Sequence, residues 1–260
     1  MRLSGTPSSH LFQKSPEVIR DSHFTVDDVW ATFRCGEAQI AYRRRKGESQ
    51  FDDMKAASVH MGMRDSIAYA RQMHSNSIII VDSPGFVGEG DGLITDRSEV
   101  VLAIQVADCV PIFLAERRGK ARGLIHAGWK GTVANIAREG VKMMVSRIGA
   151  GVDNLYCLLG PSIRSCCYKI GKDVAEQFRS SYLTKSRGNF YTLDLHRANL
   201  EQLIEAGVRN ENISFDTRCT FCSKNGLHSF RRDADVAGRN ICIFRGINGA
   251  TFKGSYRKGK

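Results

Sequence analysis

A chain of 260 residues, with no internal repeat and no Pro/Ser-rich linker, predicts one large domain with a substantial core. Its first 20 residues lack the apolar stretch of a secretory signal and no later apolar run reaches about 18 residues, which excludes a membrane-spanning helix and favours a cytoplasmic protein. The net charge of +11 favours anionic partners such as phosphate, but no aromatic-interleaved basic motif accompanies it, so nucleic acid is not an expected partner.

The first predicted elements are short strands. Residues 1–23 predict a loosely ordered segment, residues 24–250 a single domain, and residues 251–260 a basic tail. The domain begins with a strand pair or turn within residues 26–40. The β-rich runs that follow, each bounded by turn residues, are 78–81, 100–106, 110–114 and 123–126.

Helices join the strands in the second half of the chain. Apolar residues recur at helical spacing over residues 132–149, where Gly149 supplies a C-terminal stop and Gly140 weakens the prediction. The remaining predicted elements are helices at 172–182 and 196–206 and strands at 155–159, 191–193, 213–215 and 241–244. Because they interleave without regular βαβ repetition, they favour a mixed α/β (α+β) sandwich over a doubly wound fold.

Three potential metal ligands lie near the ends of these predicted strands. Cys109 lies in the sequence VADCVP, His126 begins HAGWKG, and His74 directly precedes the apolar run at 78–81. Nitrogen and sulfur donors suit zinc, and a catalytic zinc site typically uses three protein ligands and leaves a fourth position open. The trio therefore predicts an open zinc site.

The ordered sequence blocks around this trio resemble the laccase-domain family. That family is also called multicopper polyphenol oxidoreductases and is described as zinc-dependent purine nucleoside phosphorylases. The resemblance runs from about Gln72 to about Phe244, whereas the region before Gln72 matches poorly. Besides the three ligand segments, the matching blocks are 90–95 (GDGLIT), 159–163 (LGPSI), 167–168 (CY), 194–195 (DL), 198–199 (AN), 219–220 (CT), 229–233 (SFRRD) and 238–239 (GR).

The resemblance implies a fold, a metal site and an activity. It implies a single catalytic domain of stacked α/β/β/α layers, and it carries the family's zinc ligands onto His74, Cys109 and His126, with Cys109 and His126 in the catalytic centre. The implied reaction cleaves adenosine, inosine or methylthioadenosine with phosphate, and the implied family chemistry extends to adenosine deamination. Ser75 and Lys169 depart from the family pattern, which leaves the substrate selectivity undefined, and the sequence does not define the oligomeric state.

Basic residues near these blocks are candidate substrate ligands. If a helix begins at residue 132, the backbone N–H groups of residues 128–131 face an anion, and Lys130 adds charge there. Arg231 and Arg232 bring two guanidinium groups that could bind phosphate or form a salt bridge with Asp233. We expect one arginine to reach the site and the other to serve structure, with Arg231 as the preferred substrate ligand.

Other chemistries remain open. Without metal, Cys109 and His126 could form a thiolate–imidazole pair. The protein would then be a cysteine-type amide hydrolase that edits cell-wall peptide precursors. Activity that survives zinc removal would favour this hydrolase. A non-catalytic zinc module is another alternative. Laccase-like polyphenol oxidation would need a multicopper cluster, which 7 histidines without a His-x-His pair do not favour, although the trio could bind copper in vitro.

The other cysteines predict reduced thiols. The 8 cysteines are scattered, and the adjacent pair Cys166-Cys167 is poor geometry for an ordinary disulfide framework. Cys219 and Cys222 have CxxC spacing and, with His228 beyond them, could indicate a second zinc. The chain contains no partner CxxC, so this interpretation is the weaker one.

Overall fold

The structure is a computed structural model that describes residues 25–27, 30–35, 38–45, 66–117, 121–222 and 227–246. The predicted loose segment 1–23 and basic tail 251–260 lie outside the described residues, so the domain boundaries remain a prediction. Within the described part of the chain, no helix is both long and apolar enough to cross a membrane.

The first of two large sheets has seven strands, and in it the last described strand of the chain pairs with a strand near the beginning. Strand β16 lies between β3 and β8 and is antiparallel to both, with Cys242 opposite Tyr42 on one side and Ile104 on the other. The strand order across the sheet is β1 (Thr25–Asp27), β2 (Trp30–Cys35), β3 (Ala38–Arg45), β16 (Arg239–Gly246), β8 (Val101–Val106), β4 (Ile67–Arg71) and β6 (Gly85–Glu89).

The second large sheet has six strands and carries the centre of the core. Its middle is antiparallel, but β5 pairs with β7 and β11 with β15 in parallel, so the sheet is mixed. The strand order is β15 (Ile213–Phe215), β11 (Leu155–Leu159), β9 (Val110–Glu116), β10 (Arg122–Ala127), β7 (Gly92–Thr95) and β5 (Ile78–Ile80).

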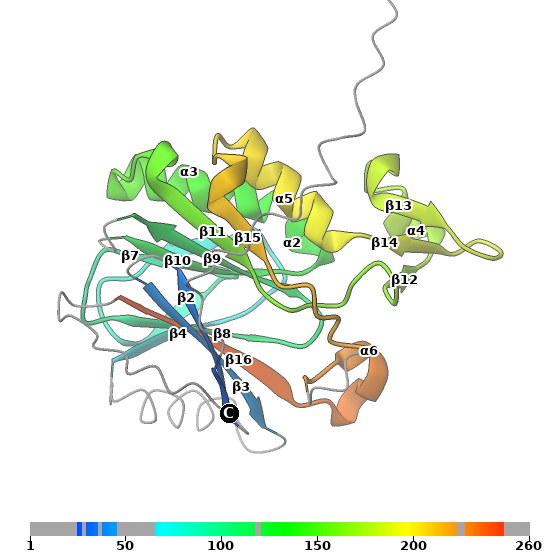
Figure 1. The fold of residues 1–260 in the computed structure, drawn as a ribbon, viewed down its shortest axis with the longest axis horizontal. Coiled ribbons are helices and arrows are strands. Elements are labelled where there is room, and N and C mark those ends of the chain that lie inside the picture. The colour runs from blue at the N-terminus through cyan, green and yellow to red at the C-terminus, as the bar shows by residue number, and fades with distance from the viewer. Residues whose placement is uncertain are drawn as a thin grey trace, which may run out of the picture.

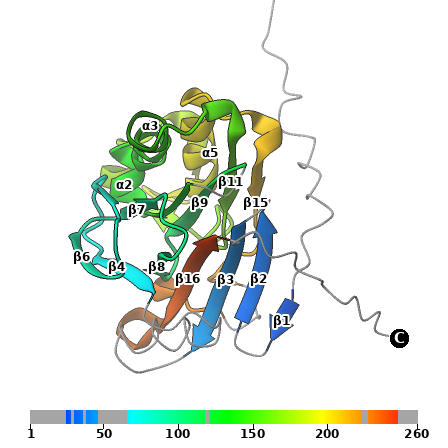
Figure 2. The ribbon, with the colours of Figure 1, turned by 90° about the vertical axis from the view of Figure 1, so that its left-hand side faces the viewer.

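The two sheets pack face to face, and helices cover the far side of the six-stranded sheet (Figures 1 and 2). Between the sheets, the rings of Phe113 and Phe244 meet edge to face with centroids 5.5 Å apart, inside a buried apolar cluster. Strands β7, β8 and β10 are buried along their whole length, which explains their nearly continuous apolar sequences. The covering helices are α2 (Trp129–Val133), α3 (Ile136–Ile148) and α5 (Leu195–Glu205).

Two predicted helices differ from those observed. The helix expected over 132–149 begins at Trp129 and is broken at Asn135, which has a left-handed φ of 62°. Gly140, which weakened the helix prediction, lies within α3 at a close contact with the sheet, where a Cβ would lie 2.2 Å from Ile125 Cδ1. The helix expected over 172–182 shortens to α4 (Lys172–Ala175) and a 3₁₀ turn at Ser180–Tyr182.

Smaller elements complete the described fold. A three-stranded sheet projects beside α4 in the order β12 (Lys169–Ile170), β14 (Tyr191–Leu193) and β13 (Leu183–Lys185). Other short elements are α6 (Phe230–Asp233) and 3₁₀ turns at Val152–Asn154, Asn210–Asn212 and Ala234–Val236. The mixed α+β prediction is confirmed, with α/β/β layers evident; the described residues do not test the expected second helical layer.

Candidate metal centre

His74, Cys109 and His126 converge at one end of the sandwich. One ligand atom from each residue lies within 4.8 Å of the others, and the His74 and His126 rings meet edge to face at 4.8 Å between centroids. His74 and Cys109 lie on two of the connections, β4–β5 and β8–β9, that pass from the seven-stranded to the six-stranded sheet, while His126 is the penultimate residue of β10. His126 is buried, Cys109 half-buried and His74 exposed, so the centre opens to solvent on one side.

Asp91 organises the centre from behind. Its Oδ1 lies 2.8 Å from His126 Nδ1 and also accepts a hydrogen bond from the His74 backbone N–H. Its Oδ2 accepts hydrogen bonds from the backbone N–H of Met73 and from both the N–H and the hydroxyl of Ser75. A carboxylate on Nδ1 fixes the imidazole and leaves Nε2 for a metal, the usual arrangement behind metal-binding histidines.

These contacts determine the protonation of the centre. Burial would raise the pKa of Asp91, but the hydrogen bonds from His126 and Ser75 outweigh it and lower the pKa to about 2. Burial would also raise the pKa of Cys109, yet the charge of His126 and the hydrogen bonds with His126 and His74 lower it to about 6. Against its own burial, His126 has its pKa raised to about 9 by Cys109 and Asp91. A thiolate and a carboxylate therefore flank a protonated His126, and a metal cation that binds here would replace the proton on Nε2.

Gly128 leaves room for the ligands. A Cβ at this position would lie 3.0 Å from His74 Cδ2 and 3.1 Å from Cys109 Sγ, so a side chain would crowd both. The next glycine, Gly131, faces the Ser75 carbonyl oxygen, which would lie 2.7 Å from a Cβ. The glycines of the HAGWKG block therefore allow α2 to approach the loop that carries His74. The short distances among the donor atoms and their N/N/S chemistry fit a three-ligand zinc site.

Asp108 links Cys109 to two distant loops. Its carboxylate accepts a hydrogen bond from the Thr220 hydroxyl and another from the Arg231 backbone N–H, each at 2.6 Å. Its carbonyl accepts a hydrogen bond from the Ile163 N–H, and its φ of 89° is unusual for a residue with a side chain. Three hydrogen bonds hold Asp108 in this strained backbone conformation, and they thereby position the next residue, Cys109.

Tyr168 and Arg231 form part of the wall of the centre. The Arg231 guanidinium lies over the Tyr168 ring, 5.1 Å from its centroid, and donates to the Lys169 carbonyl. Burial, reinforced by the negative charges of Cys109 and Asp108, raises the pKa of Tyr168, while Arg231 opposes that rise. Tyr168 is therefore a neutral hydroxyl beside a thiolate and a carboxylate.

The remaining predicted substrate ligands differ in their surroundings. Lys130 is exposed on α2, with its ammonium 5.7 Å from the centre of the Trp129 ring. Arg232 donates to the carbonyls of Thr220, Phe221 and Leu227 and forms an ion pair with Asp233. These contacts hold neighbouring loops together, and the assignment of Arg231 and Arg232 as substrate ligands stays a prediction. The predicted anion site at a helix start loses support, because α2 begins at Trp129 and has only 5 residues.

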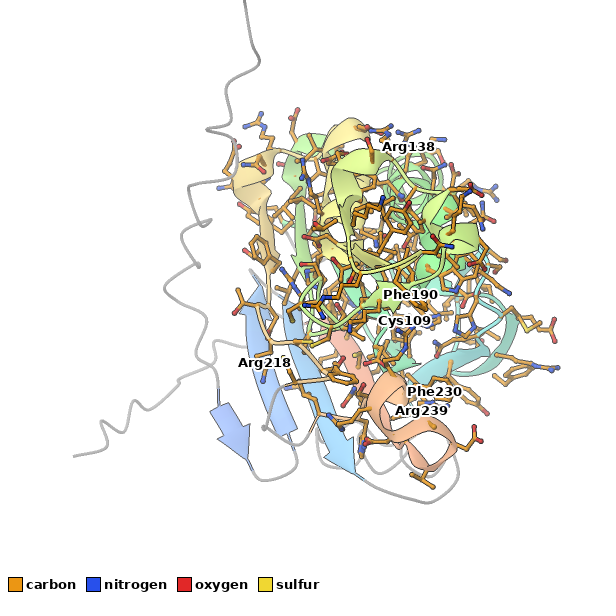
Figure 3. All side chains as sticks on the ribbon, turned by 90° about the vertical axis from the view of Figure 1, so that its right-hand side faces the viewer. Cys109, Arg138, Phe190, Arg218, Phe230 and Arg239 are labelled. Carbon is orange, nitrogen blue, oxygen red and sulfur yellow. The ribbon has the colours of Figure 1, made fainter. Side chains whose placement is uncertain are left out.

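Two exposed aromatic side chains lie on the same face as Cys109 in Figure 3. Phe190 is 57% exposed and Phe230, which precedes Arg231, is 49% exposed. Sequence reasoning assigned no role to either residue, nor to Asp91, Asp108 or Tyr168. Asp91 lies in the family-like block 90–95, but nothing in the sequence marks its carboxylate as the partner of His126. For Asp108 the signal was a charge directly beside Cys109.

The chain belongs to the multi-copper polyphenol oxidoreductase laccase family. A sequence model described as multi-copper polyphenol oxidoreductase laccase matches residues 46–245, which confirms the resemblance seen in the motifs. The chain is 39% identical over 178 residues to a protein from Deinococcus radiodurans named purine nucleoside phosphorylase, covering 67% of this chain and 68% of that protein. It is 38% identical over 160 residues to purine nucleoside phosphorylase YlmD from Geobacillus stearothermophilus, covering 59% and 58%.

A relative with a different name and two solved structures extend the comparison. Adenosine deaminase RL5, from an unknown prokaryotic organism, is 33% identical over 213 residues, which cover 75% of this chain and 76% of that protein. The crystal structure of Geobacillus stearothermophilus YlmD superposes with a TM-score of 0.80 at 25% identity, covering 87% of this chain and 100% of YlmD. The Bacillus licheniformis hypothetical protein YfiH gives 0.79 at 24% identity, covering 86% and 99%, and supports the fold.

Proposed function

We propose that this protein is a zinc-dependent purine nucleoside phosphorylase. The observation that carries the proposal is the open trio of His74, Cys109 and His126, in which the contact of Asp91 with His126 Nδ1 leaves Nε2 for a metal. Relatives named purine nucleoside phosphorylase support the class of substrate. The reaction joins a phosphate oxygen to the ribose C1′, breaks the C1′–N9 bond, and releases a purine that takes up a proton. Adenosine, inosine and methylthioadenosine are the proposed substrates.

The three ligands would hold zinc at the solvent-facing end of the sandwich. Zinc bound there supplies a Lewis acid that polarises an oxygen of the bound reactant. Asp91 keeps the proton of His126 on Nδ1 through its 2.8 Å contact, so Nε2 stays available. The described cysteines are all free thiols, which suits the cytoplasmic location we propose.

Residues around the trio suit the two reactants. Lys130 and Arg231 are exposed cations that can attract phosphate, and Arg231 is held in place by its backbone bond to Asp108. Phe230 offers an exposed ring on which a purine can stack. Tyr168, kept protonated, is a candidate donor to the departing base.

The test combines metal analysis with product analysis. Purified wild type is expected to release purine from adenosine or inosine only with phosphate, to form ribose 1-phosphate, and to lose this activity on chelation and regain it with zinc. Cys109→Ser should lose the activity together with its zinc at the trio. Purine release that persists in a fully zinc-free protein would overturn the proposal and favour Cys109 as a nucleophile.

Adenosine deamination is a second candidate, favoured by the 33% identity to adenosine deaminase RL5. Deamination gives inosine and ammonia without phosphate, whereas phosphorolysis of adenosine gives adenine. Following adenine, inosine and ammonia in one assay, with and without phosphate, separates the two activities. A separate assay, with copper-loaded protein, a phenolic substrate and dissolved oxygen as the oxidant, tests polyphenol oxidation, the activity in the family's descriptive name.

A further inference from the structure

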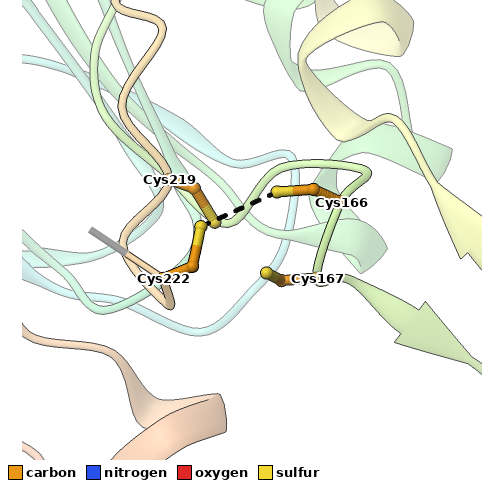
Figure 4. A group of neighbouring side chains, drawn as sticks. All are labelled: Cys166, Cys167, Cys219 and Cys222. Carbon is orange, nitrogen blue, oxygen red and sulfur yellow. Dashed lines mark hydrogen bonds between the residues drawn. The ribbon is translucent and has the colours of Figure 1, made fainter. Parts of the chain in front are cut away.

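Four cysteines outside the trio converge on one point of the surface. Figure 4 shows Cys166 and Cys167 on one turn facing Cys219 and Cys222 on another. One sulfur from each lies within 4.8 Å of the others, and the sulfurs of Cys166 and Cys222 are 3.9 Å apart. Four thiolates around zinc at about 2.3 Å lie about 3.8 Å from one another in a tetrahedron, so each sulfur–sulfur distance in the cluster is at most about 1 Å longer than in a tetrathiolate site.

Strand pairing brings these two turns together. Strands β11 and β15 run parallel, and each continues into one of the turns. Beyond the strands, Ser162 and Cys219 form a further parallel bridge, in which the Thr220 N–H donates to the Ser162 carbonyl at 3.0 Å. The main-chain register therefore places the two cysteine-bearing turns side by side.

The backbone around Cys219 suits a thiolate. The Arg164 N–H donates to the Cys219 sulfur at 3.4 Å, and the N–H groups of Phe221 and Cys222 also donate to it. Such N–H groups stabilise the negative charge of a metal-bound sulfur. From the opposite side, the Arg232 guanidinium donates to the carbonyls of Thr220 and Phe221 and so fixes the turn in this conformation.

We propose that Cys166, Cys167, Cys219 and Cys222 form a structural zinc site, separate from the trio and independent of the function proposed above. Four protein ligands close the coordination shell, so the site holds metal without an open position for substrate. His228, the ligand that the CxxC spacing suggested, is not in the cluster, because its ring packs against Gly238. The adjacent pair Cys166-Cys167 takes the place of the second CxxC that the sequence lacks.

The zinc would fasten the loops that position the trio. Thr220 lies between two of the ligands and donates to Asp108, the residue before Cys109. Ile163, three residues before Cys166, donates to the Asp108 carbonyl. Metal at the cluster would therefore hold two of the three hydrogen-bond partners of Asp108, Thr220 and Ile163, in place.

The first measurement is zinc per chain, by elemental analysis of protein purified under reducing conditions. We expect about two zinc ions in wild type, about one in Cys109→Ser, about one in Cys222→Ser, and none in the double variant. Cys222 is exposed, so its replacement should leave the fold intact, and Ser165→Ala, next to Cys166, is the matched control that should keep both ions. Wild type with a single zinc that disappears in Cys109→Ser would overturn the proposal.

A spectroscopic measurement identifies the ligands without altering the cluster. Cobalt(II) loaded into Cys109→Ser should show the sulfur-to-cobalt charge-transfer bands and intense visible absorption of a tetrahedral tetrathiolate, and both should be absent from the cobalt-treated double variant. Because this sample keeps all four cysteines, the result does not depend on whether Cys222→Ser folds. A disulfide between the two turns in native protein alkylated before reduction, with no metal bound at the cluster, would refute the zinc site.

Discussion

Asp91 and His126 are joined by a 2.8 Å contact between Oδ1 and Nδ1, and the same carboxylate also binds the backbone that carries His74. One buried side chain thus positions two of the three proposed metal ligands. Cys109, the third, depends on a different carboxylate, that of its neighbour Asp108, whose partners lie on distant loops. Two carboxylates, those of Asp91 and Asp108, therefore position the proposed metal ligands through different sets of hydrogen bonds.

Replacing Asp91 should weaken metal binding. In Asp91→Asn the charge behind His126 is lost and the amide can present an N–H to Nδ1, which disfavours the tautomer that leaves Nε2 free. We expect zinc affinity at the trio to fall by roughly 10- to 100-fold, the usual effect of removing such a partner. Competition with a chromophoric chelator measures it. Glu89→Gln, which removes an exposed carboxylate paired with Arg71, should leave the affinity unchanged; equal losses in both variants would contradict the assignment.

Adding a methyl group at Gly128 should also impair the trio. Its Cβ would lie within about 3 Å of both His74 and Cys109, so Gly128→Ala should lower zinc occupancy at that site even though its backbone φ of −76° suits alanine. Gly151→Ala is the matched control, because its Cβ would meet only the end of the Asn154 side chain, at 3.1 Å. Elemental analysis of both variants checks the prediction, which fails if Gly128→Ala binds zinc like wild type.

The link between Thr220 and Asp108 should contribute to stability. Thr220→Val keeps the shape of the side chain but leaves Asp108 Oδ1 without its 2.6 Å donor. Because both residues are buried, we expect a loss of about 1–3 kcal/mol in the free energy of unfolding. Urea denaturation measures it, with the exposed Thr184→Val as the control. Similar stability of the two variants would show that this bond contributes little.

The buried His196 predicts acid sensitivity. Burial and then the charge of Arg164 hold its pKa well below the ordinary 6.5, despite its contact with the Gly160 carbonyl. Below about pH 6.5 His196 is protonated in the unfolded chain but stays neutral in the folded chain. The free energy of unfolding therefore decreases as the pH falls, by up to about 1.4 kcal/mol per pH unit. Unfolding free energies between pH 7.5 and 5.5 should therefore fall more steeply in wild type than in His196→Gln, which keeps the same metal ligands. Parallel slopes would contradict a neutral His196.

The two exposed cations should affect phosphate more than nucleoside. Under the proposed function, Lys130→Ala and Arg231→Ala should each raise the KM for phosphate by roughly tenfold, the value of about one charge-assisted hydrogen bond. Lys142→Ala removes an exposed lysine of α3 that is paired with Glu139, and it should have no effect. Steady-state kinetics at varied phosphate and saturating nucleoside give the answer; unchanged constants in both variants would remove these residues from the phosphate site.

The sequence by itself determined the kinds of donor and most of the strands. Alternating or continuous apolar runs located β9, β10 and β11 to within two residues at either end, because burial against a sheet leaves a local pattern. Family-like blocks around His74, Cys109 and His126 indicated the trio. Helix ends were less predictable, since the break at Asn135 depends on how α2 and α3 pack.

Only the tertiary structure decided which residues surround the donors. Asp91 reaches His126 because β7 and β10 are antiparallel neighbours, and Asp108 reaches Thr220 across 112 positions of the chain. The four-cysteine cluster was also not predictable from the sequence, which contains no second CxxC. The adjacent pair Cys166-Cys167 meets Cys219 and Cys222 through the parallel pairing of β11 with β15. Local periodicity reports which residues are buried, whereas strand register, set by contacts between distant segments, determines which of them touch.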